Sequence, residues 1–197
     1  MKLILASGSE SRRRVLTAAG VPFEMVVPEV DEAAIKDALL ANRTDLPDIA
    51  AALADAKALA VSTKHPEAFV LAGDQVLAFE GQLISKCRDL AEARELLGRL
   101  RGRTHSLLTS LSLACAYDVV WRFRTESHLT MRDFSDAFLS AYLKAEGESV
   151  LSGVGCYKLE GLGAQLFERV EGDFFAILGL PLLPLLSELR ERGVLVS

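Results

Sequence analysis

The sequence predicts an α/β fold in which a mixed, twisted sheet is flanked by helices. Short apolar runs bounded by turn residues indicate strands, and segments with the helical repeat of apolar residues lie between them. Two long strand-like runs follow each other directly at residues 106–114 and 119–129, with no helix between them. Such neighbours form an antiparallel hairpin, so the sheet is not a purely parallel one built from regular strand and helix repeats.

The remaining elements follow from the same two patterns. The hairpin turn is expected at Tyr117 and Asp118, between the two long runs. The other expected strands are residues 3–6, 23–27, 69–78 and 82–84. The expected helices are residues 12–19, 33–41, 48–63, 90–100, 135–146 and 182–192.

Capping residues support several of these boundaries. Side-chain oxygens at a helix start accept hydrogen bonds from unpaired backbone N–H groups, and such residues stand at four expected starts: Asp31, Asp48, Asp89 and Ser135. Glycine adopts a left-handed backbone easily and therefore ends helices, and it follows three of them: Gly20, Gly147 and Gly193.

The composition is that of a folded, acidic chain. With 197 residues, 50% hydrophobic content and a mean hydropathy of +0.25, the chain suffices for one domain or two small lobes, and general disorder is excluded. The formal net charge of -5 argues against nucleic acid as a partner, since non-specific binding needs a basic surface. Neither a signal peptide nor an apolar run of membrane-spanning length is visible, so we expect a cytoplasmic protein with no membrane partner.

The three cysteines, Cys87, Cys115 and Cys156, have no C-x-x-C spacing. An odd number of unspaced cysteines is typical of reduced thiols. We therefore expect neither disulfides nor a zinc site.

The segment 3–16 predicts an anion-binding site. An apolar strand runs into a Ser/Gly turn and then into a helix that opens with three arginines, residues 12–14. A helix N-terminus attracts anions through its unpaired N–H groups and positive dipole end, and the hydroxyls of Ser7 and Ser11 can donate to phosphate oxygens. The alternative is a solvated basic turn, because the segment matches neither common glycine-rich phosphate motif.

Two carboxylates are candidates for catalysis or metal binding. Asp74 interrupts a long apolar strand, where a carboxylate is costly unless it is paired, hydrogen-bonded or bound to metal. It is therefore a candidate catalytic base or metal ligand, and the alternative is a strand-end acid that caps a turn. Glu32 lies in an acidic loop before a helix, where acids are also ordinary partners of the helix dipole.

Two lysines complete a set of groups suited to phosphoryl chemistry. Lys86 ends a short apolar strand, whereas Lys57 lies in an Ala-rich helix and by composition alone would be a solvated lysine. Carboxylates that hold a divalent cation and basic side chains that hold oxyanions are the usual components of such sites.

Two further polar residues are candidates for contact with a nucleobase. Gln75 follows Asp74, and Glu160 lies in the glycine-rich loop 153–164. A carboxylate accepts from amino or ring N–H groups, and an amide both donates and accepts. The alternative for the loop is a plain turn between strands.

Taken in order, these segments resemble the successive motifs of the Maf family of nucleoside triphosphate pyrophosphatases. The resemblance covers almost the whole chain. Its segments are residues 5–16, the acidic loop 28–32, an Ala-x-x-Lys-Ala helix at 54–58, Gly-Asp-Gln-Val at 73–76 with Gly81 and Lys86, Gly102-Arg103-x-His105, the loop 157–164, and residues 171–182.

The resemblance implies a fold related to inosine triphosphate pyrophosphatases, with two lobes around a cleft and a divalent cation, Mg²⁺ or Mn²⁺. The implied reaction converts a nucleoside triphosphate and water into a monophosphate and pyrophosphate. By position, Asp74 is the proton acceptor, and Glu32 is a metal or water partner that shares the cation with Asp74. The residues implied to hold the phosphates are Ser7, Arg12, Arg13, Lys57 and Lys86.

Departures from the family pattern bear on the substrate. Glu10 and Cys87 stand where the family usually has proline. Gln75 and Glu160 resemble the branch that prefers 7-methyl-GTP, but Ser11 replaces the aromatic residue of that branch, so a stacking contact with a cationic base is missing. The sequence favours a modified purine nucleotide.

Two other functions are compatible with these residues. One is a non-catalytic, nucleotide-binding regulator of septum formation, and the other is a phosphatase that releases orthophosphate. Intact Asp74, Lys57 and Lys86 favour the pyrophosphatase, because a pure binding module needs no base. By resemblance we also expect a homodimer and a role in cleaning the nucleotide pool or arresting cell division.

Overall fold

The structure, a computed structural model, describes residues 2–196 and divides the chain into two compact units. Unit 1 contains residues 2–75, Leu108–Thr125 and residues 173–196, and unit 2 contains Val76–Leu107 and Glu126–Gly172. Each unit is thus assembled from segments far apart in the chain. The expectation of a single domain over residues 1–197 is not tested by this division and stays a prediction.

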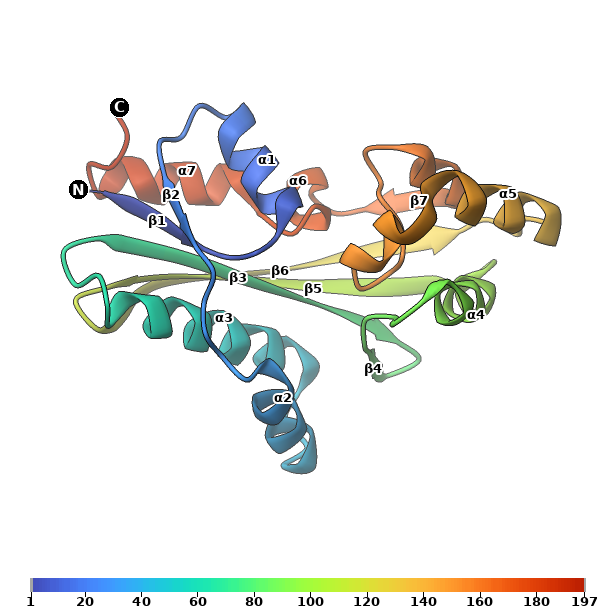
Figure 1. Ribbon diagram of the computed structural model, residues 1–197, viewed down its shortest axis with the longest axis horizontal. Helices are drawn as coiled ribbons and strands as arrows, with labels where there is room; N and C mark the ends of the chain where they lie inside the picture. The colour runs from blue at the N-terminus through green and yellow to red at the C-terminus, as the bar shows by residue number, and fades with distance from the viewer. Residues whose placement is uncertain (1, 197) are drawn as a thin grey trace. The chain divides into compact units, whose positions relative to one another are not determined.

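The strands form a mixed sheet, which confirms the predicted α/β class (Figure 1). Their hydrogen-bonded order is β2-β1-β3-β5-β6-β7, and β4 pairs with the end of β3. β1 runs parallel to β2 and β3, whereas β4 is antiparallel to β3 and β7 is antiparallel to β6. The strands are Leu3–Ala6 (β1), Glu24–Val26 (β2), Phe69–Phe79 (β3), Gln82–Ile84 (β4), Thr104–Cys115 (β5), Asp118–Met131 (β6) and Phe167–Glu171 (β7).

The helices include all six that the sequence predicts. They are Glu10–Ala18 (α1), Glu32–Ala41 (α2), Leu46–Ser62 (α3), Leu90–Leu100 (α4), Asp136–Glu146 (α5), Phe174–Ile177 (α6) and Leu182–Glu191 (α7), with two 3₁₀ helices, Gly147–Ser152 (η1) and Leu162–Leu166 (η2). Asp31, Asp89 and Ser135 cap α2, α4 and α5 as predicted. Asp48 is not a cap, because α3 begins after Asp45 and Asp48 lies in its first turn.

In unit 1, helices cover both faces of the sheet (Figure 1). Leu3 and Leu5 of β1 belong to a core with residues of α1 and α7, whereas Ile4 and Ala6 belong to a second core with Ala58 of α3. Successive strand side chains point to opposite faces, so β1 is apolar throughout because both of its faces are buried. The small residues of the second core bring α3 close to β3.

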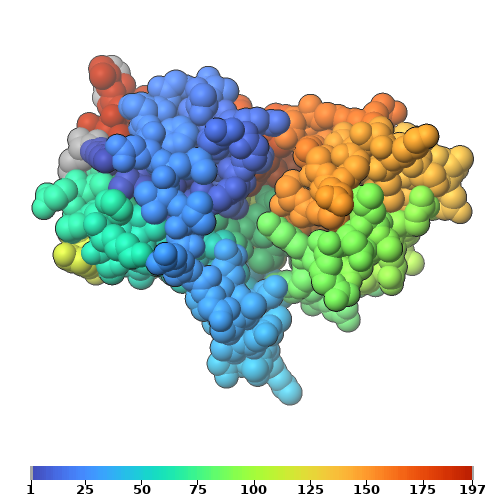
Figure 2. Space-filling view, viewed as in Figure 1, coloured from blue at the N-terminus to red at the C-terminus, as the bar shows by residue number. Residues whose placement is uncertain are grey.

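Helix α2 is a largely exposed element of unit 1. None of its residues is buried, and it contacts α3. In Figure 2 residues 32–41, in light blue, stand out from α3 and the rest of unit 1. Glu32 is the first residue of this exposed helix.

Unit 2 is built around α4 and α5, which contact each other. The buried face of α4 repeats with the helical period and consists of Ala93, Leu96, Leu97 and Leu100. The buried residues of α5 are Leu139, Tyr142 and Leu143. None of the helices within residues 2–196 combines the length and the apolar character that crossing a bilayer requires.

Several element boundaries differ from the prediction by one or more residues, and two elements were not predicted. α1 begins at Glu10, two residues before the predicted start, because Ser9 caps it by accepting from the Arg12 N–H. The hairpin turn lies at Ala116 and Tyr117, whose φ angles of 47° and 77° suit a two-residue turn between twisted strands. β7 and α6 were not predicted, since four of the five residues of β7 are exposed and α6 is a single turn.

Candidate active site

A buried lysine joins two carboxylates in unit 1. The Nζ atom of Lys57 lies 2.6 Å from Oδ1 of Asp74 and 2.8 Å from Oε2 of Glu32. The side chains of Lys57 and Asp74 are only 9% and 12% exposed, whereas that of Glu32 is 53% exposed. Pairing offsets part of the cost of burying each charge, and it places three groups that the sequence singled out around one point.

The small residues of α3 explain how Lys57 reaches Asp74. Ala54 and Ala58 flank Lys57 in the sequence and are fully buried. Because alanine leaves room for close packing, the helix lies near enough to β3 for the lysine stem to be buried with its ammonium on the strand. The interpretation of Lys57 as a solvated lysine is therefore wrong, and the role that the family resemblance implies agrees better with its burial.

Arg12 lies in a slot beside Asp74 that two glycines create. A Cβ atom on Gly73 would lie 3.2 Å from the Arg12 Nε, and one on Gly179 would lie 3.5 Å from it. The Nε atom donates to the Gly179 carbonyl at 2.8 Å, and Nη1 donates to the Ser7 hydroxyl at 3.4 Å. Burial lowers the pKa of the Arg12 guanidinium, and the charges of Asp74 and Glu32 oppose that shift.

Sequence reasoning missed both glycines of this slot. Gly73 had a signal, because a glycine inside an apolar strand often marks the close approach of another group. Gly179 has a φ of +89°, which favours glycine, but no sequence pattern tied it to Arg12.

The Ser/Gly turn and the start of the helix that follows it are arranged only in part as the sequence suggested. The Ser7 oxygen accepts from the Ser9 N–H and from Arg12, so its proton can be donated to a ligand. Ser11 instead donates to the Leu178 carbonyl at 3.0 Å. The structure therefore uses the Ser11 hydroxyl to hold α1 to the segment after α6.

Arg13 also has a different contact from the one expected. Its Nη2 atom lies 2.6 Å from the Glu10 carboxylate, and its side chain is 51% exposed. Because α1 begins at Glu10, its first turn carries an acid, and the expectation that the helix opens with the three arginines is wrong. Arg12 lies near Asp74, and the phosphate contact expected of Arg13 stays a prediction.

Gln75 is tied to unit 1 by its amide group. Its Nε2 atom donates to the Thr109 hydroxyl at 2.8 Å and to the Ala176 carbonyl at 2.9 Å, with Ile177 O at 3.3 Å. Only the side-chain carbonyl oxygen is left for a ligand. The position links β3 and β5 to α6, and Thr109 is a residue that no sequence signal indicated.

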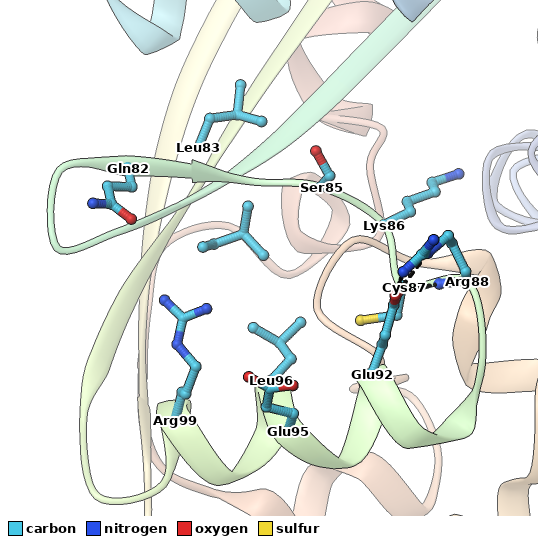
Figure 3. A pocket seen from close by; sticks show the side chains of 11 residues that line it. Gln82, Leu83, Ser85, Lys86, Cys87, Arg88, Glu92, Glu95, Leu96 and Arg99 are labelled. Carbon is cyan, nitrogen blue, oxygen red and sulfur yellow. Dashed lines mark hydrogen bonds and ion pairs between the residues drawn. The ribbon is translucent and has the colours of Figure 1, made fainter.

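Lys86 and Glu160 belong to unit 2. Lys86 is exposed and lines an open pocket of about 520 Å³ between the β4 segment and α4 (Figure 3). Arg88 and Arg99 also line this pocket, together with Glu92, which pairs with Arg88. Glu160 is exposed and lies just before η2.

His105 is a buried residue of β5 in unit 2. It is 2% exposed, and its Nε2 atom lies 2.7 Å from the Tyr157 hydroxyl. Burial lowers the pKa of His105 to about 4, so the ring is neutral. This contact holds the glycine-rich loop 153–164 against β5.

Asp74 and Glu32 are carboxylates of unit 1 that could hold a divalent cation. Asp74 and Glu32 already place one oxygen each within 2.8 Å of a single ammonium. Mg²⁺ is commonly held by one or two carboxylates together with substrate phosphates and water. No group of three or more His, Cys, Asp or Glu side chains suited to a metal occurs within residues 2–196, so the protein alone would not enclose the ion.

Comparisons with known proteins identify the family of this chain. The sequence model of the Maf-like protein family matches residues 2–192. The chain is 49% identical over 196 residues to a nucleoside triphosphate pyrophosphatase of Maricaulis maris, with 98% of each chain covered. It is 46% identical over 193 residues to a 7-methyl-GTP pyrophosphatase of Rhizobium meliloti, with 98% of this chain and 97% of that protein covered.

A third curated relative, a nucleoside triphosphate pyrophosphatase of Caulobacter vibrioides, is 49% identical, with 97% of this chain and 96% of that protein covered. A solved dITP/XTP pyrophosphatase from Mycobacterium abscessus has a TM-score of 0.40 and 16% identity, and an overlay of that quality supports no inference about this chain. Because the family model spans nearly the whole sequence and the curated relatives are almost half identical from end to end, this protein belongs to the Maf-like family.

Proposed function

We propose that this protein hydrolyses nucleoside triphosphates to monophosphate and pyrophosphate. The observation that carries the proposal is the buried Lys57 ammonium held between Asp74 and Glu32, with the Arg12 guanidinium beside them. Relatives that carry the pyrophosphatase name are 44% to 49% identical over almost the full chain, which supports the same activity here.

The arrangement suits attack of water on the α-phosphorus. Arg12, Ser7 and Lys57 are the groups of unit 1 that would bind phosphate oxygens and offset the charge that accumulates on them. Lys57 holds Oδ1 of Asp74, and we assign the other carboxylate oxygen as the acceptor of the proton that water loses. Catalysis is then mainly a matter of position and electrostatics.

A divalent cation, Mg²⁺ or Mn²⁺, is part of this proposal, with Asp74 and Glu32 as its protein ligands. When bound, such a cation supplies charge neutralisation at the phosphate oxygens. Glu32 lies at the start of the exposed helix α2, so its carboxylate can adjust to a ligand without disturbing a core.

Lys86 and Glu160 enter the proposal through the family resemblance, Lys86 as a phosphate contact and Glu160 as a contact to the base. The modified purine preference stays a prediction, because the curated relatives include both general and 7-methyl-GTP names. The donors of Gln75 are already used within unit 1, so any contact from Gln75 to a base would use its oxygen. The homodimer, the cytoplasmic location and the cellular role also stay predictions.

The test is an assay of purified protein against ordinary and modified nucleoside triphosphates, including 7-methyl-GTP, UTP and dTTP, with Mg²⁺ or Mn²⁺ and with a chelator. Monophosphate and pyrophosphate are expected as the only products. Asp74→Asn should lower kcat by about a hundredfold or more while nucleotide still binds. Asp55→Asn is the matched control, since Asp55 is a half-buried carboxylate on the same helix as Lys57 that pairs with Arg122.

Other outcomes would assign another function. Release of orthophosphate in place of pyrophosphate would make the protein a phosphatase. Nucleotide binding without turnover of any substrate would support a regulator of septum formation.

A further inference from the structure

A chain of three hydrogen bonds links a buried threonine of β5 to Arg12. The hydroxyl of Thr109 donates to the Ala176 carbonyl at 3.2 Å, and the same carbonyl accepts from the Gly179 backbone N–H at 2.8 Å. The Gly179 carbonyl in turn accepts from the Arg12 Nε at 2.8 Å. All four residues belong to unit 1. The guanidinium is thus tied, through residues 176–179, to a hydroxyl of the sheet.

The Thr109 hydroxyl is oriented by a second hydrogen bond. Its oxygen accepts from the Gln75 Nε2 at 2.8 Å, and the side chain is only 3% exposed. A hydroxyl carries one proton, so this arrangement leaves the proton for the Ala176 carbonyl. The Gln75 Nε2 reaches the same carbonyl at 2.9 Å. Side chains from β3 and β5, which are neighbours in the sheet, therefore converge on one backbone oxygen and fix it relative to the sheet.

The turn after α6 transmits this order to Arg12. The N–H of Gly179 holds the turn to Ala176, and the carbonyl of Gly179 holds the guanidinium. A shift of the Ala176 carbonyl therefore changes the direction of the acceptor that Arg12 meets. Figure 1 shows α6 beside the first turn of α1, and the Ser11 hydroxyl joins the two by donating to the Leu178 carbonyl at 3.0 Å.

The two bonds from Arg12 orient its guanidinium plane. Nε donates to the Gly179 carbonyl and Nη1 to the Ser7 hydroxyl. A guanidinium has five N–H donors in a rigid planar arrangement, so fixing two of them sets the direction of the others. Two parallel N–H groups bind a phosphate well only when the plane is correctly placed. The acceptor at Gly179 therefore affects how Arg12 presents its remaining donors.

We propose that Thr109 is a positioning residue for Arg12, acting through the Ala176 carbonyl and Gly179. In Thr109→Val a methyl group replaces the hydroxyl, cannot donate to the carbonyl and needs more room than the 3.2 Å of the hydrogen bond, so the turn shifts. The effect on turnover rests on the proposed function, in which Arg12 binds phosphate. We expect kcat/KM to fall by about tenfold in Thr109→Val, because a binding group is displaced by a fraction of an ångström. Thr109→Ser keeps the hydroxyl and should stay close to the wild type.

The first experiment follows the Nε–H group of Arg12 directly, by ¹⁵N NMR of the full-length protein without nucleotide. Its signal is identified by its loss in Arg12→Lys. In Thr109→Val the signal should shift and exchange with water at least about tenfold faster, and in Thr109→Ser it should not. Ser112→Ala is the matched control, because it removes another fully buried hydroxyl of β5, one that donates to Asp55, and should leave the signal unchanged. If Thr109→Val does not fold, Thr109→Ala replaces it.

The second experiment is a double-mutant cycle on kcat/KM. In an Arg12→Ala background, Thr109→Val should cause no further loss, because the group that Thr109 positions is gone. A general structural role of Thr109 would instead lower the melting temperature in both backgrounds and multiply the two kinetic losses. Ser112→Ala should lower the melting temperature and keep the wild-type kcat/KM.

The outcomes separate this proposal from the proposed function. A folded Thr109→Val protein that keeps the wild-type Arg12 Nε–H signal overturns the positioning role. A changed signal with multiplied kinetic losses overturns the effect of Thr109 on activity through Arg12. Absence of turnover in the wild type counts against the pyrophosphatase proposal, while the NMR measurement still decides whether Thr109 positions Arg12.

Discussion

The ammonium of Lys57 lies 2.6 Å from a carboxylate oxygen of Asp74, and both side chains are almost entirely buried. Such a pair contributes little to stability compared with an apolar pair of the same size, but removing one partner leaves an uncompensated charge. The pair also leaves both groups oriented before a ligand arrives. Position and charge are what phosphoryl transfer needs from a protein.

Lys57→Met should destabilise the fold by about 3 kcal/mol, because it leaves Asp74 and Glu32 close together without a cation. Adding Asp74→Asn should recover part of the loss, with a coupling free energy of at least about 1 kcal/mol. Urea denaturation of the single and double variants measures both quantities. Lys64→Met is the control, since Lys64 forms an exposed pair with Glu29 and should cost less than about 1 kcal/mol. If the destabilisation of the double variant equals the sum of the destabilisations of the Lys57 and Asp74 single variants, the coupling is contradicted.

Gly73→Ala should impair activity more than stability. Its Cβ would lie 2.8 Å from the Leu111 side chain and 3.2 Å from the Arg12 Nε, so both must shift. Under the proposed function, we expect kcat/KM to fall by about tenfold, because Arg12 is displaced. The matched control is Gly98→Ala, a helical position with open space around it, which should gain up to about 1 kcal/mol. An unchanged kcat/KM in Gly73→Ala would show that the position of Arg12 between Gly73 and Gly179 does not affect activity.

Gln75→Glu distinguishes a structural role from contact with a base. A carboxylate cannot donate to the Ala176 carbonyl or repeat the bond to Thr109, so we expect a loss of about 1 to 3 kcal/mol in stability. Gln165→Glu, at an exposed position, is the control. If the free energy of unfolding is preserved and only the preference among nucleobases changes, Gln75 acts on the substrate and not as an anchor.

His105 should make the protein less stable in mild acid. Because burial lowers its pKa from 6.5 to about 4, the unfolded chain binds the proton more readily than the folded one. The contribution of the neutral ring is complete above the unfolded pKa and is lost as the pH falls from about 6.5 towards 4, by about 2 kcal/mol between about pH 7 and about pH 5.

Urea denaturation at these two pH values measures the effect. His105→Gln, or His105→Phe should the first variant fold poorly, is expected to lack this part of the pH dependence. His128→Gln changes a histidine that is 49% exposed and should keep the wild-type difference. An unaltered pH difference in the His105 variants would show that another group is responsible.

The sequence by itself determined the local elements and the types of residue at the site. Apolar periodicity located all six long helices and most strands, and Asp31, Asp89 and Ser135 marked helix starts, because period and capping depend only on near neighbours. These patterns did not predict β7 and α6, since an exposed strand and a single helical turn have little periodicity of their own.

The tertiary structure decided which of these residues meet. Lys57 pairs with carboxylates from α2 and β3, and Arg12 lies between Gly73 and Gly179. It also used the donors of Gln75 inside unit 1. Partners so far apart in the chain depend on strand order and on how closely helices pack, which local patterns do not encode.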